Sequence, residues 1–355
     1  ADHTKNSLKL KEMKKLKIAY YCSNRTVFPP PGNVAAANQS VMVDIVAEMV
    51  KMGHQVTVYG SKGSKFEGVK IVDLGMVPHG SDGNYSWVGD LNCAYRVTYI
   101  SQLIADSGNY DIIHMHTGRS IYGQAFERFS KCPVVHTLHN DLEDVFKPAM
   151  NTFYNSKLVS ISNTQREPMP NLNYVATIYH GINIKKIPFS KKAQDKFVFI
   201  GRTVESKGVK VAVDLAVQQG FSLDIYGPET DFLKTNVLPY AIDNISYKGV
   251  AARFTQKWHK AFSTAKAMLF PIQWREPFGL VLIEAMAHGT PVIAYDLGSV
   301  REIIQDGKTG FICKPGDTRA MARAIKKIEE MPKKRYVEMR KECRAHVEKY
   351  FTRKI

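Results

Sequence analysis

The stretch MLFPIQWREPFGLVLIEAMAHGTPVIA, residues 268–294, decides the fold class of this 355-residue chain. An apolar run at 268–270 leads into a turn with Pro277 and Gly279. An apolar helical pattern over 279–288 follows, and then a second apolar run at 292–294. A strand, a helix and another strand in this order predict a βαβ unit, whose two strands lie parallel.

The same alternation continues on both sides of this stretch. Further strands are predicted at 18–22, 56–59, 70–74, 111–115, 134–138, 158–161, 197–200, 223–226, 245–248 and 310–312. Further helices are predicted at 41–52, 95–104, 121–129, 145–154, 207–219, 255–264, 319–330 and 335–350. We therefore expect an α/β protein with two Rossmann-like parallel-sheet domains, divided near a mixed, Lys-rich stretch at 174–193. Ligands of open parallel sheets bind outside the carboxyl ends of the strands, so two facing domains would enclose a central cleft.

The composition is that of an ordinary globular protein, with 44% hydrophobic and 23% charged residues. No apolar run approaches the ~20 residues of a membrane-spanning helix, and residues 1–17 lack the apolar core of a secretory signal. The five cysteines are odd in number and widely spaced, which favours a reduced, cytoplasmic protein without a disulfide framework.

Most of the net charge of +16 lies at the two ends of the chain. Residues 1–17, a basic tail, hold six Lys against two acidic residues, and residues 321–355 hold twelve Lys or Arg against five Glu. Solvated helix faces explain such runs best, and peripheral contact with an anionic membrane or a polyanionic acceptor is the alternative. No nucleic acid is expected as a partner, because the sequence has no zinc finger, RRM signature or basic zipper.

Several common cofactor motifs are absent from the sequence. It has no Gly-x-Gly-x-x-Gly, no Walker phosphate loop and no Asp-x-Asp. A dinucleotide cofactor is therefore disfavoured, and so is a divalent ion held by an Asp-x-Asp pair.

The turn and helix at 276–284 are the densest chemical signal. Pro277 and Gly279 allow a tight turn whose amides become the free N–H groups of the next helix, a ready anion site. Glu276 and Glu284 lie about two helical turns apart and could bind hydroxyls at two points of one ligand. By spacing alone, a capping carboxylate and an ordinary helix glutamate are the more economical interpretation.

A second signal is Phe199-Ile200-Gly201-Arg202-Thr203-Val204-Glu205-Ser206-Lys207-Gly208. A strand ends in Gly201, and Arg202 and Lys207 follow on the next loop and helix start. The two cations could hold a diphosphate, or they could be surface charges beside a strand end.

Together these motifs resemble the retaining glycosyltransferases of family 4, which have the GT-B architecture. Glu276-Pro277-Phe278-Gly279 through Glu284 resembles that family's paired-glutamate motif, and Gly201-Arg202 with Lys207-Gly208 resembles its phosphate motif. The stretch 289–294, then Gly298, Glu302 and Gly307-x-x-Gly310, is also typical. The resemblance is strong over 197–315 and weaker but colinear from 18 to 181.

The resemblance implies roles for individual residues. Arg202 and Lys207 would neutralise the leaving nucleoside diphosphate, and the amides of Phe278, Gly279 and Leu280 would bind a donor phosphate or sugar oxygen. Glu276 would contact donor-sugar hydroxyls and Glu284 the ribose. Replacing either Arg202 or Lys207 with Ala should lower kcat/KM by about 10²-fold or more, and thermal stability should stay nearly unchanged if the side chains line an open cleft.

The resemblance also extends to the N-terminal half. Histidines cluster at 114, 116, 136 and 139; His139 follows a predicted strand, where similar enzymes keep a histidine near donor sugar and acceptor. A zinc site built from this cluster is disfavoured by family and spacing. The family's first loop often carries a Gly-Gly pair facing the diphosphate and acceptor, whereas this chain has Gly32 followed by Asn33, which tolerates a left-handed turn.

The resemblance implies an N-terminal acceptor-binding domain at 18–185, a C-terminal nucleotide-sugar domain at 186–334 and a last helix, within 335–355, that returns to the first domain. Tyr336, Met339, Cys343, Val347 and Tyr350 would form its buried stripe, with the Lys and Arg between them facing water. The expected activity is metal-independent, retaining transfer of a hexose from a UDP-glucose-like donor to an unidentified acceptor, with no other cofactor. A GT-B sugar-nucleotide epimerase and a non-catalytic, basic polyanion-binding protein are the alternatives.

Overall fold

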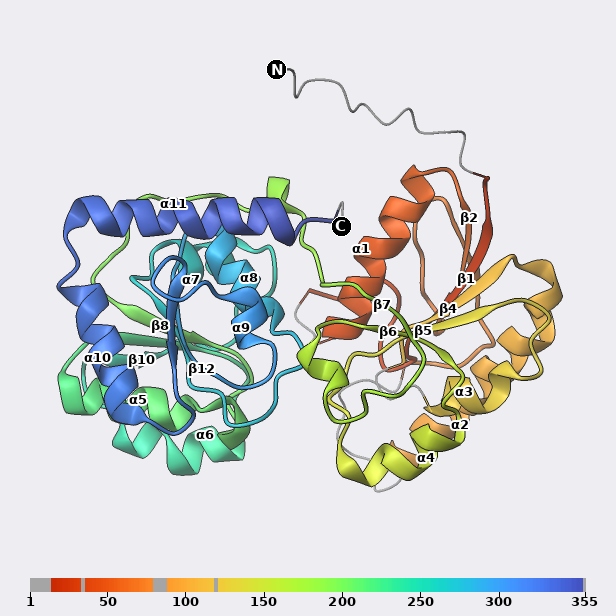
Figure 1. Cartoon of the computed structure of the whole chain (residues 1–355), viewed down its shortest axis with the longest axis horizontal. Helices are drawn as coiled ribbons and strands as arrows, with labels where there is room; N and C mark the ends of the chain where they lie inside the picture. The colour runs from red at the N-terminus through yellow and green to blue at the C-terminus, as the bar shows by residue number, and fades with distance from the viewer. Residues whose placement is uncertain (1–13, 33–35, 79–87, 118–120, 354–355) are drawn as a thin grey trace, which may run out of the picture.

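The computed structural model describes residues 14–32, 36–78, 88–117 and 121–353. Within these residues the chain forms two parallel sheets, each flanked by helices, and the two units lie side by side (Figure 1). This confirms the predicted α/β architecture with two Rossmann-like domains. Most of the basic tail and Asn33, the residue expected to form the first turn, lie outside the described residues.

The described N-terminal half has a seven-stranded sheet in the order β3-β2-β1-β4-β5-β6-β7. Its strands are β1 (Lys17–Tyr21), β2 (Gln55–Tyr59), β3 (Val69–Val72), β4 (Ile112–Met115), β5 (Val134–Thr137), β6 (Lys157–Ser160) and β7 (Tyr174–Thr177). Its helices are α1 (Ala37–Lys51), α2 (Val88–Ala105), α3 (Ile121–Glu127) and α4 (Lys147–Thr152), with short 3-10 helices that include η3 (Thr164–Arg166) and η4 (Ile184–Lys186).

The described C-terminal half has a six-stranded sheet in the order β10-β9-β8-β11-β12-β13. Its strands are β8 (Phe197–Ile200), β9 (Leu223–Tyr226), β10 (Ile245–Tyr247), β11 (Met268–Phe270), β12 (Val292–Tyr295) and β13 (Gly310–Cys313). Its helices are α5 (Val209–Gln219), α6 (Asp231–Asn236), α7 (Gln256–Ser263), α8 (Leu280–Ala287), α9 (Val300–Ile303), α10 (Thr318–Glu329) and α11 (Lys333–Tyr350), and η5 (Glu205–Lys207) precedes α5.

Strand order places the two chemical motifs next to each other. In the second sheet the order reverses between β8 and β11, which are neighbours although they are far apart in sequence. Loops that leave such a switch point diverge to opposite faces and open a crevice where ligands bind. The 201–208 loop follows β8 and the 271–279 loop follows β11, so both border this crevice.

One strand and two α-helices of the described structure were not predicted. Strand β7 lies at the edge of the first sheet and its side chains are only partly buried, so it lacks the apolar run that marks a buried strand. Helices α6 and α9 span six and four residues, which is too short for a helical period to emerge from the sequence.

The last helix lies along the C-terminal domain, and the segment after it makes the crossing (Figure 1). Met339, Cys343 and Val347 are fully buried, as expected, and α11 packs against α8. Beyond the helix, the Ile182 backbone N–H donates to Phe351 O at 2.9 Å, and Arg353 pairs with Asp44 of α1. The chain end therefore ties the two halves of the molecule together.

Two expectations for α11 were wrong. Tyr350, placed in the buried stripe, is 41% exposed because it lies in the last turn. Arg340, expected to face water, is fully buried and donates to the carbonyl oxygens of Ser190, Ser263 and Ala265 at 2.8–2.9 Å. A guanidinium has five N–H donors, so three backbone carbonyls can replace its hydration.

The described residues contain no helix long and apolar enough to cross a membrane. The five cysteines of the chain are free thiols.

Candidate functional site

The loop after β8 brings Lys207 to the switch point. Gly208 ends the short helix η5 with φ +75°, and a Cβ there would lie 1.9 Å from the Pro271 carbonyl oxygen. Only glycine permits this contact, which presses η5 against the loop after β11. The Gln273 N–H donates to Ser206 O at 2.9 Å and locks the two loops together.

Lys207 and Glu276 form a mostly buried ion pair in this crevice. Lys207 Nζ lies 2.5 Å from Glu276 Oε2, and the side chains are 16% and 13% exposed. Trp274 Nε1 donates to the same carboxylate oxygen at 3.2 Å, and Lys207 Nζ sits 4.7 Å from the centre of the Trp274 ring. Lys207 is therefore held between a carboxylate and an aromatic ring. We had expected its side chain to line an open cleft, and it does not.

Arg202, the other predicted cation, is on the surface. Its side chain is exposed and makes no hydrogen bond or ion pair within the described ranges of the chain. The Gly201 N–H donates to Tyr226 O at 3.0 Å, which fixes the backbone before it. Arg202 thus stands at the rim of the crevice, and Lys207 inside it.

The N-terminus of α8 faces the same crevice. Gly279 precedes the helix with φ +81°, a left-handed conformation that suits glycine, and Leu280 is the first helical residue. The first N–H groups of a helix lack intrahelical acceptors, so this end carries partial positive charge. Phe278 is buried, and its ring packs edge-on against His180 of the first domain at 5.0 Å.

Glu284, on the second turn of α8, is held by a residue that sequence reasoning missed. It is 8% exposed, and its Oε1 lies 2.7 Å from Arg253 Nε. Burial raises the pKa of Glu284, while the Arg253 charge opposes that rise and favours the carboxylate. Gly32 of the first domain lies near the Arg253 backbone, because a Cβ at Gly32 would be 3.8 Å from the Arg253 carbonyl oxygen.

His139 lies opposite, in a buried row of histidines. His116 Nδ1 and His139 Nε2 are 3.0 Å apart, and the His139 and His180 rings stack at 5.3 Å. Burial lowers the pKa of His139 well below its usual value and that of His180 to about 3, so both are neutral at pH 7. His139 can donate or accept a hydrogen bond there but cannot act as a cation. No group of three metal-ligating side chains occurs among the residues placed by the structure.

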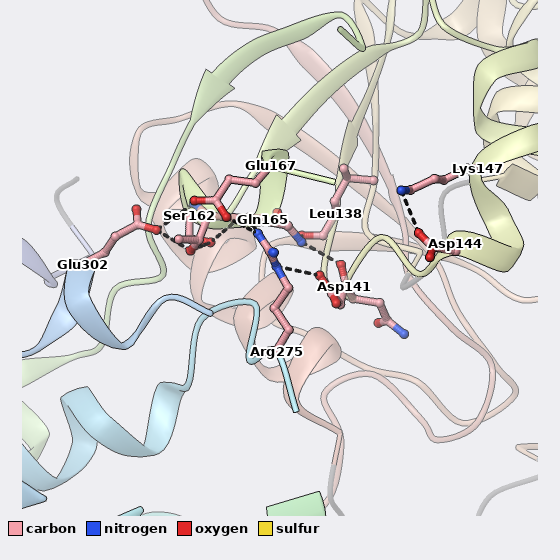
Figure 2. Close-up of polar contacts among 11 residues, drawn as sticks. Leu138, Asp141, Asp144, Lys147, Ser162, Gln165, Glu167, Arg275 and Glu302 are labelled. Atoms are coloured by element: carbon pink, nitrogen blue, oxygen red, sulfur yellow. Dashed lines mark hydrogen bonds and ion pairs between the residues drawn. The ribbon is translucent and has the colours of Figure 1, made fainter. Parts of the chain in front are cut away.

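Two residues of the C-terminal half reach across to the first domain (Figure 2). The Glu302 carboxylate accepts the backbone N–H groups of Asn163 and Thr164 at 2.7 and 2.8 Å, and the hydroxyls of Thr164 and Tyr179 at 2.5 and 2.8 Å. Burial raises the pKa of Glu302, but these hydrogen bonds together outweigh it, and the net pKa is lowered. The carboxylate thus caps η3.

Arg275 makes the second interdomain contact (Figure 2). Its Nη2 donates to Glu167 Oε2 at 2.7 Å and to the Thr164 carbonyl oxygen, and its Nε lies 3.5 Å from Asp141 Oδ1. Arg275, Glu167 and Asp141 border an open pocket of about 440 Å³. Asp141 follows His139 by two positions in the sequence. With Glu302, Arg275 holds the two halves of the crevice in one arrangement.

Family models match both halves of the chain. The model described as Glycosyltransferase Family 4 matches residues 39–186, and the model described as Glycosyl transferases group 1 matches residues 182–348. The chain belongs to the GT-B glycosyltransferases of family 4.

Curated relatives agree with this assignment. The glycosyltransferase is 25% identical over 279 residues to an uncharacterised glycosyltransferase of Methanocaldococcus jannaschii, covering 74% of this chain and 78% of that one. It is 26% identical over 255 residues to a phosphatidyl-myo-inositol mannosyltransferase of Mycobacterium leprae, covering 65% and 67%.

Solved structures share its fold. A sucrose-phosphate synthase from Thermosynechococcus elongatus has a TM-score of 0.76 at 18% identity, covering 95% of both chains. Anabaena HepE, solved with UDP and with UDP-glucose, has a TM-score of 0.71 in both structures at 17% and 16% identity, covering 95% of this chain and 96% of that chain.

The structure thus brings together most of the predicted site residues. Lys207 pairs with Glu276 beside the Gly279 turn, and Glu284 follows on α8. His139 lies on the other domain, where it stacks on His180. Among the described residues, Arg202 has no hydrogen bond or ion pair with any of them.

Proposed function

We propose that this glycosyltransferase moves a hexose from a UDP-glucose-like donor to an acceptor hydroxyl, with retention of configuration and without a metal ion. The observation that carries the proposal is the set of Lys207, Glu276, the α8 N-terminus and Glu284 at one switch point. Each part of a nucleotide-sugar has a partner in this set. Lys207 and the α8 amides would bind the diphosphate, and Glu276 and Glu284 would bind the hydroxyls of the transferred sugar and of the ribose.

The donor diphosphate would lie at the N-terminus of α8, beside Lys207. Charge grows on the diphosphate as the bond to the sugar breaks, and preorganised N–H groups and a cation stabilise that charge. Helix amides and Lys207 together supply this without a divalent ion, and Arg202 at the rim would add a second cation. The HepE structures with UDP and UDP-glucose support a uridine nucleotide as the first choice.

Glu276 would take the hydroxyls of the transferred sugar, and Glu284 those of the ribose. Lys207 Nζ lies 2.5 Å from Glu276 Oε2. An arriving diphosphate competes for Lys207, which releases carboxylate oxygen for the sugar. Phosphate binding and sugar recognition are thereby coupled through one lysine.

His139 would contact the transferred sugar or the acceptor from the first domain. Because it is neutral, it can orient a hydroxyl without placing charge beside the electron-poor anomeric carbon. The loop at Gly32 would approach the donor from the same side. Retention follows from the family resemblance, and we name no covalent nucleophile.

A donor screen tests the proposal. The enzyme is incubated without acceptor, in EDTA, with UDP-glucose, UDP-galactose, UDP-N-acetylglucosamine and GDP-mannose, and release of nucleoside diphosphate is measured. We expect slow hydrolysis of a UDP-hexose, and the anomeric configuration of the first-formed sugar, read by proton NMR, should be that of the donor.

Two matched variants show whether a loss of hydrolysis is specific to the donor site. Glu276→Gln should lower hydrolysis at least 10²-fold, whereas Glu205→Gln, which changes an exposed carboxylate on the neighbouring loop, should leave it unchanged. A free sugar epimerised at C2 and released without transfer would indicate the epimerase instead. Binding of heparin without any binding of UDP, measured by calorimetry, would indicate a polyanion-binding protein.

A further inference from the structure

Arg253 stands between the two domains and is not part of either donor motif. It lies on the loop between β10 and α7; its side chain pairs with Glu284 of α8, and its backbone carbonyl oxygen lies near Gly32 of the first domain. Asp44 of α1 and His180 are close enough to Arg253 for their pKa values to respond to its charge. The Arg253 guanidinium therefore pairs with Glu284, and its charge acts on Asp44 and His180 of the first domain.

The turn that carries Arg253 is held in a conformation that its sequence does not favour. The Thr255 N–H donates to Ala252 O at 3.2 Å, and Phe254, the third residue of this turn, has φ +65°. Glycine or asparagine normally fills that position, and a bulky residue there costs about 1–3 kcal/mol. Thr255 also caps α7 through its hydroxyl, which accepts the Trp258 N–H at 3.3 Å, so the turn is fixed at both ends.

The guanidinium of Arg253 is only partly used. Its side chain is 20% exposed, and its Nε pairs with Glu284. Within the described part of the chain, neither its Nε nor its buried Nη2 makes a hydrogen bond of good geometry, so the contact with Glu284 is a close ion pair. Leaving a buried N–H donor unsatisfied is costly, and one carboxylate oxygen does not fill a fork that can bind two oxyanions.

We infer that Arg253 is a donor-binding residue, which holds Glu284 in place for the ribose and donates its remaining N–H groups to the phosphate next to that ribose. The inference rests on the proposed function. In a nucleoside diphosphate the α-phosphate is the anionic group nearest the ribose, so a cation already paired with the ribose-binding carboxylate is within reach of it. A planar guanidinium can bridge a carboxylate and a phosphate oxygen, which an ammonium group cannot do with the same geometry.

Calorimetric titration with UDP and with uridine tests this inference. Arg253→Ala should weaken UDP binding about 10- to 100-fold, the range for loss of a hydrogen bond to a charged group. Uridine binding should weaken by a clearly smaller factor than UDP binding, because uridine loses the support of Glu284 but has no phosphate contact to lose. Arg253→Lys, which keeps the charge but not the fork, should fall between wild type and Arg253→Ala for UDP.

A control and a stability measurement keep the result interpretable. Lys260→Ala removes an exposed cation from the neighbouring helix α7 and should bind UDP like the wild type. Thermal melting identifies a variant that fails to fold; if Arg253→Ala does, Arg253→Lys carries the test. Equal losses for UDP and uridine would overturn the phosphate contact, and unchanged UDP binding in folded Arg253→Lys and Arg253→Ala would overturn the whole inference. Failure of the wild-type enzyme to bind UDP, GDP or ADP would instead overturn the proposed function.

Discussion

Replacing Lys207 with alanine should damage both stability and catalysis, and the structure separates the two effects. The Lys207–Glu276 pair is at least 84% buried on the lysine side, with an N–O distance of 2.5 Å. Removing one partner of a fully buried ion pair leaves the other charge buried without a counter-charge, which lowers the free energy of unfolding by about 3–5 kcal/mol. Here Trp274 Nε1 still donates to Glu276 and water reaches the edge, so we expect about 2–3 kcal/mol.

That loss is large enough to measure. For domains of this size 1 kcal/mol shifts the melting temperature by about 2–4 °C, so Lys207→Ala should melt about 4–10 °C lower. Its kcat/KM should fall at least about 10²-fold, because the diphosphate loses its buried cation. Arg202→Ala is the matched variant: its exposed side chain predicts a melting temperature within about 1 °C of wild type, while the expected kcat/KM loss stays at about 10²-fold.

The assays are differential scanning fluorimetry and initial rates with the donor identified by the screen. A double-mutant cycle with Glu276→Gln isolates the pair, and neutralising both partners should recover much of the lost stability. An unchanged melting temperature for Lys207→Ala would refute the argument from burial. Wild-type kcat/KM in that variant would refute the assignment of Lys207 to the diphosphate.

Four further outcomes are expected. Activity should persist in excess EDTA, and complete loss that a divalent ion restores would contradict metal independence. Glu302→Ala should lower kcat/KM about 10-fold and expand the molecule in small-angle scattering; since the pKa of Glu302 is lowered, its clasp should hold above about pH 4.5 and weaken as the pH falls through that lowered pKa, whereas Glu302→Gln should show no such transition. Truncation after Met331 should abolish transfer and destabilise the C-terminal domain by uncovering α8, and an active truncated protein that no longer floats with anionic liposomes would make α11 a membrane anchor. Glu276→Gln should bind UDP at least as tightly as the wild type, because Lys207 is then free for the diphosphate; weaker binding would contradict the coupling between them.

The sheets and most helices could be predicted because apolar periodicity is local. Strands such as β8 and β12 are short buried runs bounded by turns, and their neighbours follow from the alternation of strand and helix. Strand β7 was not predicted because an edge strand buries little apolar surface and therefore lacks a clear apolar run. The prediction that Arg340 faces water failed because a charged residue can be buried when backbone carbonyl oxygens surround it. Here they come from the end of α7 and from the segment at Ser190, and no sequence pattern indicates them.

The sequence indicated which residues form the candidate site, but not which side chains pair with each other there. Family resemblance placed Lys207 and Glu276 at the donor, yet nothing in the sequence indicated that the two would neutralise each other. Glu302 was noted as typical of the family, but its partner Thr164 is 138 positions away on the other domain. Arg253 lies in no motif, and only its distance to Glu284 draws attention to it.

These pairings bear on how the enzyme would bind its donor. Both predicted donor carboxylates already hold a cation, Lys207 on Glu276 and Arg253 on Glu284. A nucleoside diphosphate carries negative charge but no cation, so in this proposal it draws on Lys207 and on the N–H groups of Arg253 that Glu284 does not use. Competition for Lys207 frees an oxygen of Glu276 for a sugar hydroxyl, whereas Arg253 keeps Glu284 in place for the ribose. Charge neutralisation and hydroxyl recognition then occur in the same event, which favours a ligand that has both a diphosphate and a sugar over a ligand that has only one of them.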